Sequence, residues 1–194
     1  VERFVMISTD KAVNPTNVMG TTKLMGERLM TAANAFRQSG GPLFTSTRFG
    51  NVLGSRGSVI PIFKHQIAKV GPVTLTDPAM TRFIMTLKEA VRLVLDSTFM
   101  AQGGEVFVTK MPVVRITDLA AVMIEILAGE YGYRPEEIEV VTIGSKPGEK
   151  LYEELLSDEE TRRSIEVEKY FVVVPAFKSV YHQIEYRYEG MLAD

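Results

Sequence analysis

The stretch VERFVMISTDKAVNPTN, residues 1–17, decides the fold class. Its first eight residues form an apolar run that is typical of a strand buried in a parallel sheet. Pro15 suits the first position of a helix, with Asn14 as its cap. Apolar residues then recur at helical spacing from Val18 to Phe36, and glycines follow. A buried strand that leads into a helix of this kind indicates an α/β fold.

Apolar runs and helical patterns continue to alternate along the chain, as in an α/β protein. The pattern predicts strands over residues 43–49, 73–76, 105–109 and 138–143. It predicts helices over residues 59–70, 87–100, 118–129 and 152–156. Residues 50–57 form a glycine-rich loop, and the mixed acidic and basic residues 157–163 are typical of a solvated surface segment. From Val167 onward we expect short strands and an irregular tail.

The composition excludes several classes of protein. With 22 basic and 24 acidic residues the net charge is −2, so no basic excess points to nucleic acid or to an anionic membrane surface. The chain has no cysteine, which excludes disulfides and thiolate nucleophiles, and two histidines argue against a histidine metal cluster. No apolar run approaches the ~20 residues that span a bilayer. We therefore expect no nucleic-acid partner, no metal site and no membrane contact through this segment.

Polar residues follow the first strand. Ser8, Thr9, Asp10 and Lys11 stand at its carboxyl end, and ligands of open α/β sheets bind beyond the carboxyl ends of the strands. A hydroxyl, a carboxylate and an ammonium group side by side could move protons. A polar turn with a surface ion pair explains the same residues, so their position alone leaves both interpretations open.

Met19 and Lys23 lie four residues apart and therefore share one face of the expected helix. Residues 48–57 contain three glycines, an asparagine and two arginines. Glycine lets the backbone approach a ligand closely, and the arginine fork matches phosphate oxygens. Arg82 stands among apolar neighbours and needs an anionic partner, either a phosphate or an internal carboxylate. A solvated lysine, a flexible loop and an internal ion pair are the alternatives for these three features.

Taken together, these segments resemble the CapD-like polysaccharide-biosynthesis proteins of bacteria. That group includes UDP-N-acetylglucosamine 4,6-dehydratases and is a branch of the extended short-chain dehydrogenase/reductase family. Two long stretches carry the resemblance, STDKAVNPTN at residues 8–17 and GEKLYEELL at residues 148–156. The match runs from about Phe4 to Leu156. It implies an α/β fold that comprises the C-terminal portion of a Rossmann-type domain and a small α/β substrate-binding lobe.

The resemblance also implies how the chain is divided. Residues 1–55 and parts of 84–115 would complete the Rossmann-type sheet, and residues 56–83 and 116–194 would form mainly the lobe that binds the UDP-sugar. Nothing in the sequence matches the glycine-rich dinucleotide fingerprint. We therefore expect the chain to be a fragment that begins inside a core strand, with the N-terminal NAD-binding half upstream of it.

The resemblance assigns catalytic roles to five residues. Thr9 falls at the family's catalytic serine or threonine. Asp10 and Lys11 fall at the acid/base pair that removes water across C5 and C6 of the sugar. Lys23 falls at the lysine of the Tyr-x-x-x-Lys motif, and Met19 stands where that motif has tyrosine. Because a thioether cannot accept the proton of the C4 hydroxyl, Asp10 or Lys11 would have to take that role, directly or through water.

The binding residues are also implied by the resemblance. Lys23, Phe49 and Asn51 would contact the cofactor, which is NAD or NADP. Asn51, Arg56, Arg82 and Glu149 would contact the UDP-sugar. The group that distinguishes NAD from NADP lies in the upstream half. No metal is implied.

The implied reaction of a complete enzyme begins with oxidation of the sugar at C4 by NAD(P). Water is then eliminated across C5 and C6, and C6 is reduced, which yields a 4-keto-6-deoxy sugar nucleotide for surface polysaccharide. A UDP-sugar epimerase of the same family and a non-catalytic UDP-sugar-binding fragment are the alternatives. We expect a homo-oligomer, or pairing with the missing N-terminal half, because an exposed strand edge at residues 1–8 is unfavourable. The resemblance implies a bacterial cytoplasmic location, at the inner membrane if the complete protein is anchored.

Overall fold

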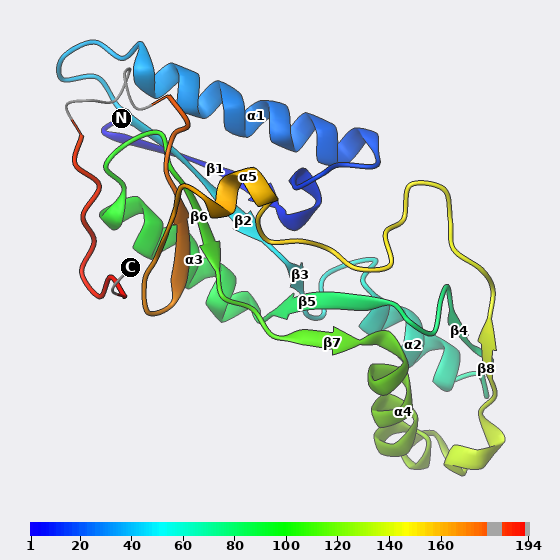
Figure 1. Ribbon diagram of the computed structural model, residues 1–194. Coiled ribbons are helices and arrows are strands. Elements are labelled where there is room, and N and C mark those ends of the chain that lie inside the picture. The colour runs from blue at the N-terminus through cyan, green and yellow to red at the C-terminus, as the bar shows by residue number, and fades with distance from the viewer. Residues whose placement is uncertain (178–183, 193–194) are drawn as a thin grey trace. The chain divides into compact units, whose positions relative to one another are not determined.

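The computed structural model describes residues 1–177 and 184–192, and the chain forms two compact units (Figure 1). Unit 1 contains residues 1–49 and 87–110 together with the described residues from Glu154 onward. Unit 2 contains residues 50–86 and 111–153. The resemblance implies that residues 116–194 belong mainly to the substrate lobe. The structure differs after Glu153, because strands from that region pair into the sheet of unit 1.

Unit 1 is built on a five-stranded sheet. In spatial order its strands are β1 (Arg3–Thr9), β2 (Leu43–Phe49), β6 (Val106–Thr109), β10 (Tyr170–Val173) and β9 (Ser164–Glu166). The first three are parallel, and the last two join them in antiparallel pairs. The predicted strand over residues 43–49 is confirmed, as is the parallel pairing of the first strand.

The predicted burial of the first strand is wrong for part of its length. Phe4 is 48% exposed and Ile7 is 40% exposed. The physical reason is that β1 stands at one end of the sheet and pairs only with β2 within the described residues. A central parallel strand has neighbours on both sides, whereas this strand has a neighbour on one side.

Two long helices cover opposite faces of this sheet (Figure 1), α1 (Val18–Ala35) and α3 (Leu87–Met100). The alternation of side chains along β6 shows the two layers. Phe107 packs in one cluster with Leu93 of α3, and Val106 and Val108 pack in the other with Val173 of β10. The predicted bounds of the helix over residues 87–100 are confirmed. None of the helices in the described residues is long and apolar enough to cross a membrane.

The start of α1 differs from the prediction. Asn17, not Asn14, caps the helix, and its side chain accepts a hydrogen bond from the backbone N–H of Gly20 at 2.9 Å. Pro15 lies in the turn before the helix. Both asparagines are suitable cap residues, and only the packing of the helix on the sheet selects between them.

The region after Glu153 also differs. The predicted helix over residues 152–156 is wrong, since these residues are irregular, and the helix that forms is α5 (Asp158–Thr161). Ser157 and Glu160 form a capping box at its start. The prediction of a solvated segment over residues 157–163 is wrong for Glu160, which is 2% exposed.

Unit 2 contains two small sheets and two α-helices. Its sheets are β3 (Asn51–Val52), β5 (Thr81–Met85) and β7 (Val113–Arg115), and β4 (Val73–Leu75) with β8 (Val140–Thr142). Its helices are α2 (Val59–Ile67), α4 (Ile116–Leu127) and the 3-10 helices η2 (Gly129–Tyr131) and η3 (Pro135–Glu137). The predictions include no strand over residues 81–85 or 113–115. Such short strands depend on pairing partners far away in the sequence.

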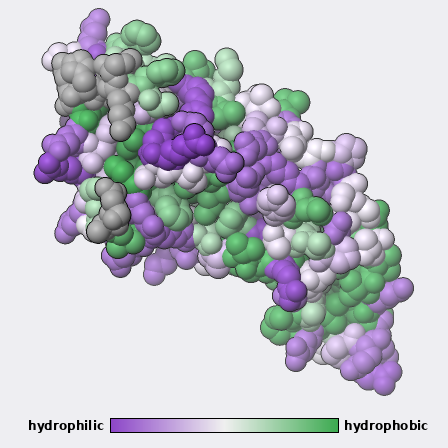
Figure 2. All heavy atoms as spheres, viewed as in Figure 1, coloured by the Kyte–Doolittle hydropathy of each residue, from purple (hydrophilic) through white to green (hydrophobic). Residues whose placement is uncertain are grey.

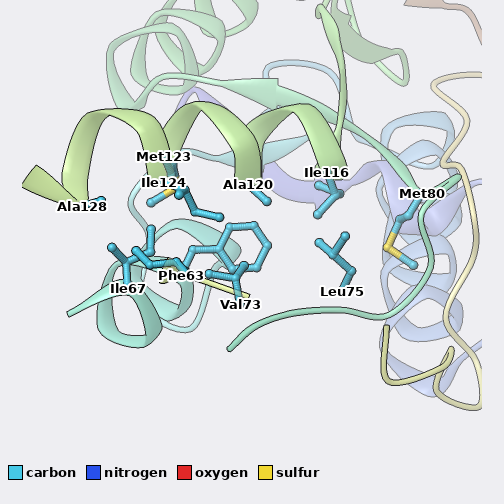
Figure 3. Packing of buried hydrophobic residues seen from close by; sticks show 11 residues of the cluster. Phe63, Ile67, Val73, Leu75, Met80, Ile116, Ala120, Met123, Ile124 and Ala128 are labelled. Atoms are coloured by element: carbon cyan, nitrogen blue, oxygen red, sulfur yellow. The ribbon is translucent and has the colours of Figure 1, made fainter. Parts of the chain in front are cut away.

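The core of unit 2 lies between α2 and α4 (Figure 3). Phe63 and Ile67 of α2 face Ala120 and Ile124 of α4, and Val73 of β4 closes one side. Burial of a Phe or Ile side chain contributes about 1.5–3 kcal/mol. Unit 2 therefore has its own hydrophobic core, which supports its loops and short strands.

Candidate active site

The residues predicted for proton transfer lie together at the carboxyl end of β1. Thr9 ends the strand, and the short 3-10 helix η1 (Asp10–Ala12) follows directly. The Thr9 hydroxyl donates to Oδ1 of Asp10 at 2.9 Å, and the Lys11 Nζ donates to the same oxygen at 2.9 Å. The Asp10 side chain is fully buried and that of Lys11 is 25% exposed. The sequence leaves open a surface Asp–Lys pair, and the burial of Asp10 argues against it.

The other carboxylate oxygen of Asp10, Oδ2, differs from Oδ1 in its hydrogen bonding. Oδ2 of Asp10 is buried and has no hydrogen-bond partner in the described part of the chain, and the same is true of the Ser8 hydroxyl. A buried polar oxygen without a partner costs free energy, so these groups suit a site where a ligand or water supplies the missing bond. A carboxylate with one bonded and one open oxygen can accept a proton or orient a donor.

The two site residues predicted on this helix, Met19 and Lys23, lie in the first turns of α1. Lys23 is half-buried, and its Nζ donates to the backbone carbonyl of Ile7 on β1 at 2.9 Å. Met19 is 47% exposed one turn earlier. Gly20 lies so close to the Lys11 carbonyl that a Cβ atom at this position would overlap the oxygen. The helix therefore packs directly on the turn that carries Asp10, and a larger residue would push the two apart.

The remaining unit 1 residue of the predicted site is Phe49. It ends β2 and is paired in register with Thr9 across the parallel ladder. It also packs against the buried cluster that contains Phe107. Phe49 and Thr9 thus end neighbouring strands at the same edge of the sheet, where parallel α/β sheets bind ligands.

The other predicted binding residues belong to unit 2. Asn51 lies in β3, beside Ile84 of β5, and Arg56 is exposed in the turn that precedes α2. Arg82 lies in β5 and is almost buried, and Nη2 lies 3.5 Å from Oε1 of Glu149. Of the partners considered for Arg82, an internal carboxylate is therefore present.

Further bonds hold the Arg82–Glu149 pair. Nη1 of Arg82 donates to the carbonyls of Thr81 at 2.7 Å and Leu151 at 3.2 Å. The other Glu149 oxygen accepts from the backbone N–H of Lys146 at 3.2 Å, which closes the turn over residues 146–149. An arginine and a carboxylate brought together from distant segments in this way can orient one another toward a polar ligand.

The sequence interpretation missed a buried ion cluster beneath α1, which consists of Glu27, Arg48 and Glu160. These side chains are 0–2% exposed. Nε and Nη2 of Arg48 bind both oxygens of Glu27 at 2.8 and 2.7 Å. Nη2 and Nη1 bind both oxygens of Glu160 at 2.7 and 2.9 Å. The available signal was the placement of Glu27 four residues after Lys23, on the same helix face.

The charges in this cluster stabilise one another. Burial acts to lower the pKa of Arg48, but hydrogen bonds and attraction from the two carboxylates outweigh it and raise the pKa. Burial acts to raise the pKa of Glu160, but Arg48 outweighs it and lowers that pKa to about 2. Arg48 and Glu160 therefore stay charged across the physiological range. No group of acidic residues or histidines that could hold a metal occurs in residues 1–177 and 184–192.

A parallel strand–helix–strand unit with polar groups at the strand end is the arrangement of a Rossmann-type α/β sheet, whose ligands bind beyond the carboxyl ends of the strands. The chain belongs to the polysaccharide biosynthesis protein family, whose model matches residues 1–175. Within it the chain is CapD-like. The capsular polysaccharide biosynthesis protein CapD of Staphylococcus aureus is 54% identical over 161 residues, which are 82% of this chain and 26% of CapD.

Two further relatives have named activities. The UDP-N-acetylglucosamine 4,6-dehydratase (inverting) of Campylobacter jejuni is 38% identical over 181 residues, 93% of this chain and 51% of that protein. The UDP-glucose 4-epimerase of Rickettsia typhi is 40% identical over 171 residues, 88% of this chain and 48% of that protein. The chain thus spans about half of these two relatives and about a quarter of CapD.

Solved structures support the fold. A crystal structure of Pen from Bacillus thuringiensis is 46% identical, with a TM-score of 0.87 over 92% of this chain and 54% of that chain. The UDP-glucose 4-epimerase of Thermus thermophilus, solved in complex with NAD, is 21% identical, with a TM-score of 0.61 over 84% of this chain and 57% of that chain. The predicted α/β fold of the Rossmann type is confirmed.

Proposed function

We propose that this chain is the substrate-side part of a nucleotide-sugar 4,6-dehydratase that acts on a UDP-N-acetylglucosamine-type substrate. One observation carries the proposal. The buried Asp10 carboxylate is hydrogen-bonded to both Thr9 and Lys11 at the carboxyl end of a parallel strand. The likeness to the Campylobacter 4,6-dehydratase supports the same substrate class.

Asp10 and Lys11 would act as the acid/base pair of the elimination. One of the two groups takes the proton from C5 of the sugar, and the other protonates the hydroxyl that leaves C6, so that one water is lost. Their separation of 2.9 Å allows a proton to pass between them afterwards. Met19 has no ionisable group, so the pair would also receive the proton of the C4 hydroxyl, and it would return one proton to C5 when C6 is reduced.

The residues of this chain fit one side of a nicotinamide dinucleotide. Lys23 is held beside the end of β1 by its bond to the Ile7 carbonyl, and with Phe49 and Asn51 it would hold the nicotinamide side of NAD or NADP. When bound, the cofactor supplies the acceptor and donor of the hydride. The glycine-rich turn for its pyrophosphate would come from a segment outside this chain, and we expect the isolated chain to bind it weakly.

The other binding residues would serve the UDP group. We assign Arg56, Arg82 and Glu149 of unit 2, together with Asn51, to contacts with the UDP-sugar. Arginine at such a site matches phosphate oxygens in a bidentate manner, and the glycines of residues 50–57 leave room for a diphosphate. The complete protein would be a bacterial cytoplasmic enzyme, or one held at the inner face of the membrane, and would form homo-oligomers.

A UDP-sugar epimerase is the second candidate, because the Rickettsia epimerase is as similar to this chain as the dehydratase is. Epimerisation needs no elimination of water, so it would use the Asp10–Lys11 pair only for the proton of the C4 hydroxyl. A non-catalytic fragment that only binds the UDP-sugar is the third. The product distinguishes the first two, because dehydration yields a sugar nucleotide lighter by one water and epimerisation leaves the mass unchanged.

Calorimetric titration of the purified chain with UDP-N-acetylglucosamine, followed by NAD⁺, tests the binding half of the proposal. We expect binding of the sugar nucleotide, little heat from NAD⁺, and at least tenfold weaker sugar-nucleotide binding by Arg56→Met. Lys64→Met removes an exposed charge from α2 and is the matched control. A folded chain that binds neither ligand would contradict this half of the proposal.

The catalytic half needs this chain joined to a glycine-rich N-terminal half. In such a protein Asp10→Asn and Lys11→Met should each lower turnover at least 100-fold, which is the usual size of an acid/base contribution. Mass spectrometry of the product reports the lost water. Full turnover by both variants would show that the acid/base assignment is wrong.

A further inference from the structure

In the buried ion cluster of Glu27, Arg48 and Glu160, the Arg48 guanidinium makes more hydrogen bonds than the neutralisation of its charge requires. Arg48 has five N–H groups, and its bonds to Glu27 and Glu160 are completed by one from Nη1 to the Leu155 carbonyl at 3.1 Å. Two carboxylates from distant segments bind the guanidinium, and Nη2 of Arg28 and Nη2 of Arg163 lie 3.7 and 3.9 Å from Oε1 of Glu160. Buried ion pairs are often no more stable than apolar residues of the same volume, so stability alone does not explain the cluster.

The cluster lies next to the candidate active site. Arg48 is paired in register with Ser8 across the β1–β2 ladder, one residue before Thr9. Glu27 stands four residues after Lys23, so the two side chains share one face of α1. The stretch of α1 from Lys23 to Glu27 is thereby bonded to β1 through Lys23 and to β2 through Glu27.

The second half of α1 is held by separate bonds. The Thr31 hydroxyl donates to the Gly104 carbonyl at 2.9 Å, and the Asn34 side chain accepts from the Phe44 N–H at 3.2 Å. These contacts lie toward the amino ends of β2 and β6. Loss of the Glu27 bonds would therefore loosen the part of the helix before Glu27, which would keep the Lys23 bond and the Asn17 cap, and would leave the last turns in place.

We infer that Glu27, Arg48 and Glu160 are positioning residues that fix the first turns of α1 against the carboxyl end of β1. In this role they hold Lys23 and Met19 at a set distance from the acid/base pair. Glu160 extends the same constraint to α5, so that three separate segments of unit 1 meet at one guanidinium. The inference deepens the proposed function and rests on it for the role of Lys23.

Amide hydrogen exchange of the isolated chain tests this inference without any ligand. In Glu27→Gln we expect exchange in residues 20–27 to rise at least tenfold more than in residues 31–35, because the helix opens locally at its start. The NMR chemical shift of the Lys23 Nζ should change in the same variant, because its bond to the Ile7 carbonyl weakens.

The matched control is Glu105→Gln. Glu105 is also a fully buried carboxylate of unit 1, but it binds the backbone N–H groups of Gln102 and Gly103 at the start of β6. Because Thr31 donates to the carbonyl of the adjacent Gly104, this variant should raise exchange in residues 31–35 and not selectively in residues 20–27. An equal rise in both halves for Glu27→Gln would overturn the inference.

If Glu27→Gln does not fold, Glu160→Gln decides, because it leaves the paired bonds between Glu27 and Arg48 in place. A selective rise in residues 20–27 of about threefold or more supports positioning, and a uniform rise overturns it. A negative hydrogen-exchange result would not change the outcome of the sugar-nucleotide titration, and a negative titration would not change the exchange result. The two proposals can therefore be rejected separately.

Discussion

At the scale of single residues, the candidate site depends on close contacts that only small side chains allow. Gly20 is such a residue, because a Cβ atom there would overlap the backbone carbonyl oxygen of Lys11. Gly26 would meet only the flexible end of Met6, which can move aside. The two glycines of α1 therefore differ in what a methyl group would cost, although the sequence shows them as equals.

We expect Gly20→Ala to lower the free energy of unfolding by about 1–3 kcal/mol, because the backbone of η1 or α1 must shift. Gly26→Ala should cost less, since Met6 can repack. Urea denaturation followed by circular dichroism measures both. Gly129→Ala, where no atom lies within 4 Å of the added Cβ, is the control. A Gly20→Ala chain as stable as the control would contradict the close packing of α1 on η1.

Two buried carboxylates should respond to pH in opposite directions. Arg48 lowers the pKa of Glu160 from 4.5 to about 2 against the effect of burial. Its stabilisation is therefore present above the unfolded pKa of 4.5 and is lost as pH falls toward 2. Burial raises the pKa of Glu105 despite its backbone hydrogen bonds, so its ionisation destabilises the fold as pH rises above 4.5.

This opposition gives a measurable prediction. The free energy of unfolding of the natural chain, minus that of Glu160→Gln, should grow by about 2–3 kcal/mol between pH 2 and pH 5. The same difference for Glu105→Gln should shrink as pH rises above 4.5. Urea titrations at several pH values test both. Parallel profiles for the two variants would show that the two carboxylates do not differ in this way.

At the scale of elements, α1 presents an apolar face to solvent, whereas its buried residues are Gly20, Glu27 and Asn34. Val18, Met25, Leu29 and Phe36 are each at least 54% exposed. They recur at helical spacing on the side away from the ion cluster, and apolar atoms appear among polar ones along the edge where α1 lies (Figure 2). An exposed apolar stripe of this kind is typical of a surface that packs against another helix or chain.

We expect this stripe to support self-association of the chain. Met25→Gln and Leu29→Gln together should shift the population toward monomer, while stability changes by no more than about 0.5 kcal/mol because the side chains are exposed. Sedimentation velocity at several concentrations measures the shift. Val122→Gln, an exposed apolar residue of α4, is the matched control. Unchanged sedimentation of the double variant would locate any self-association elsewhere.

At the scale of the whole molecule, the chain passes between the two units four times, after Phe49, Thr86, Lys110 and Glu153. Neither unit is therefore one continuous segment. The last passage is needed for unit 1, because β9, β10 and the Glu160 partner of Arg48 all follow it. The segment from Glu154 onward completes a core rather than forming an appendage.

A chain that ends at residue 153 should therefore fail to fold cooperatively. It would lose the β10 residues that cover Val106, Phe107 and Val108, and Arg48 would keep one of its two buried carboxylates. Loss of a partner from a buried ion cluster costs about 3–5 kcal/mol, and loss of core strands adds to it. Thermal and urea unfolding report cooperativity, and a sharp transition in the shortened chain would contradict this account.

The sequence by itself determined the α/β class, the strand over residues 43–49 and the helix over residues 87–100. Each of these is a long or strongly periodic segment, and its pattern of apolar residues survives whatever it packs against. The sequence also singled out Asp10 as a candidate for proton transfer and Arg82 as a cation that needs an anionic partner. The sequence neighbours of Asp10 were sufficient for that residue, because it binds Thr9 and Lys11.

Only the tertiary structure decided which of two asparagines caps α1, that residues 152–156 are irregular, and that Glu160 is buried. Short strands such as β5 and β7 and the ion cluster around Arg48 likewise depend on contacts between residues far apart in the chain. A solvated acidic residue and a buried one can have the same neighbouring residues in the sequence. The physical reason is that burial is a property of what packs on a residue, and its neighbours in sequence do not specify that.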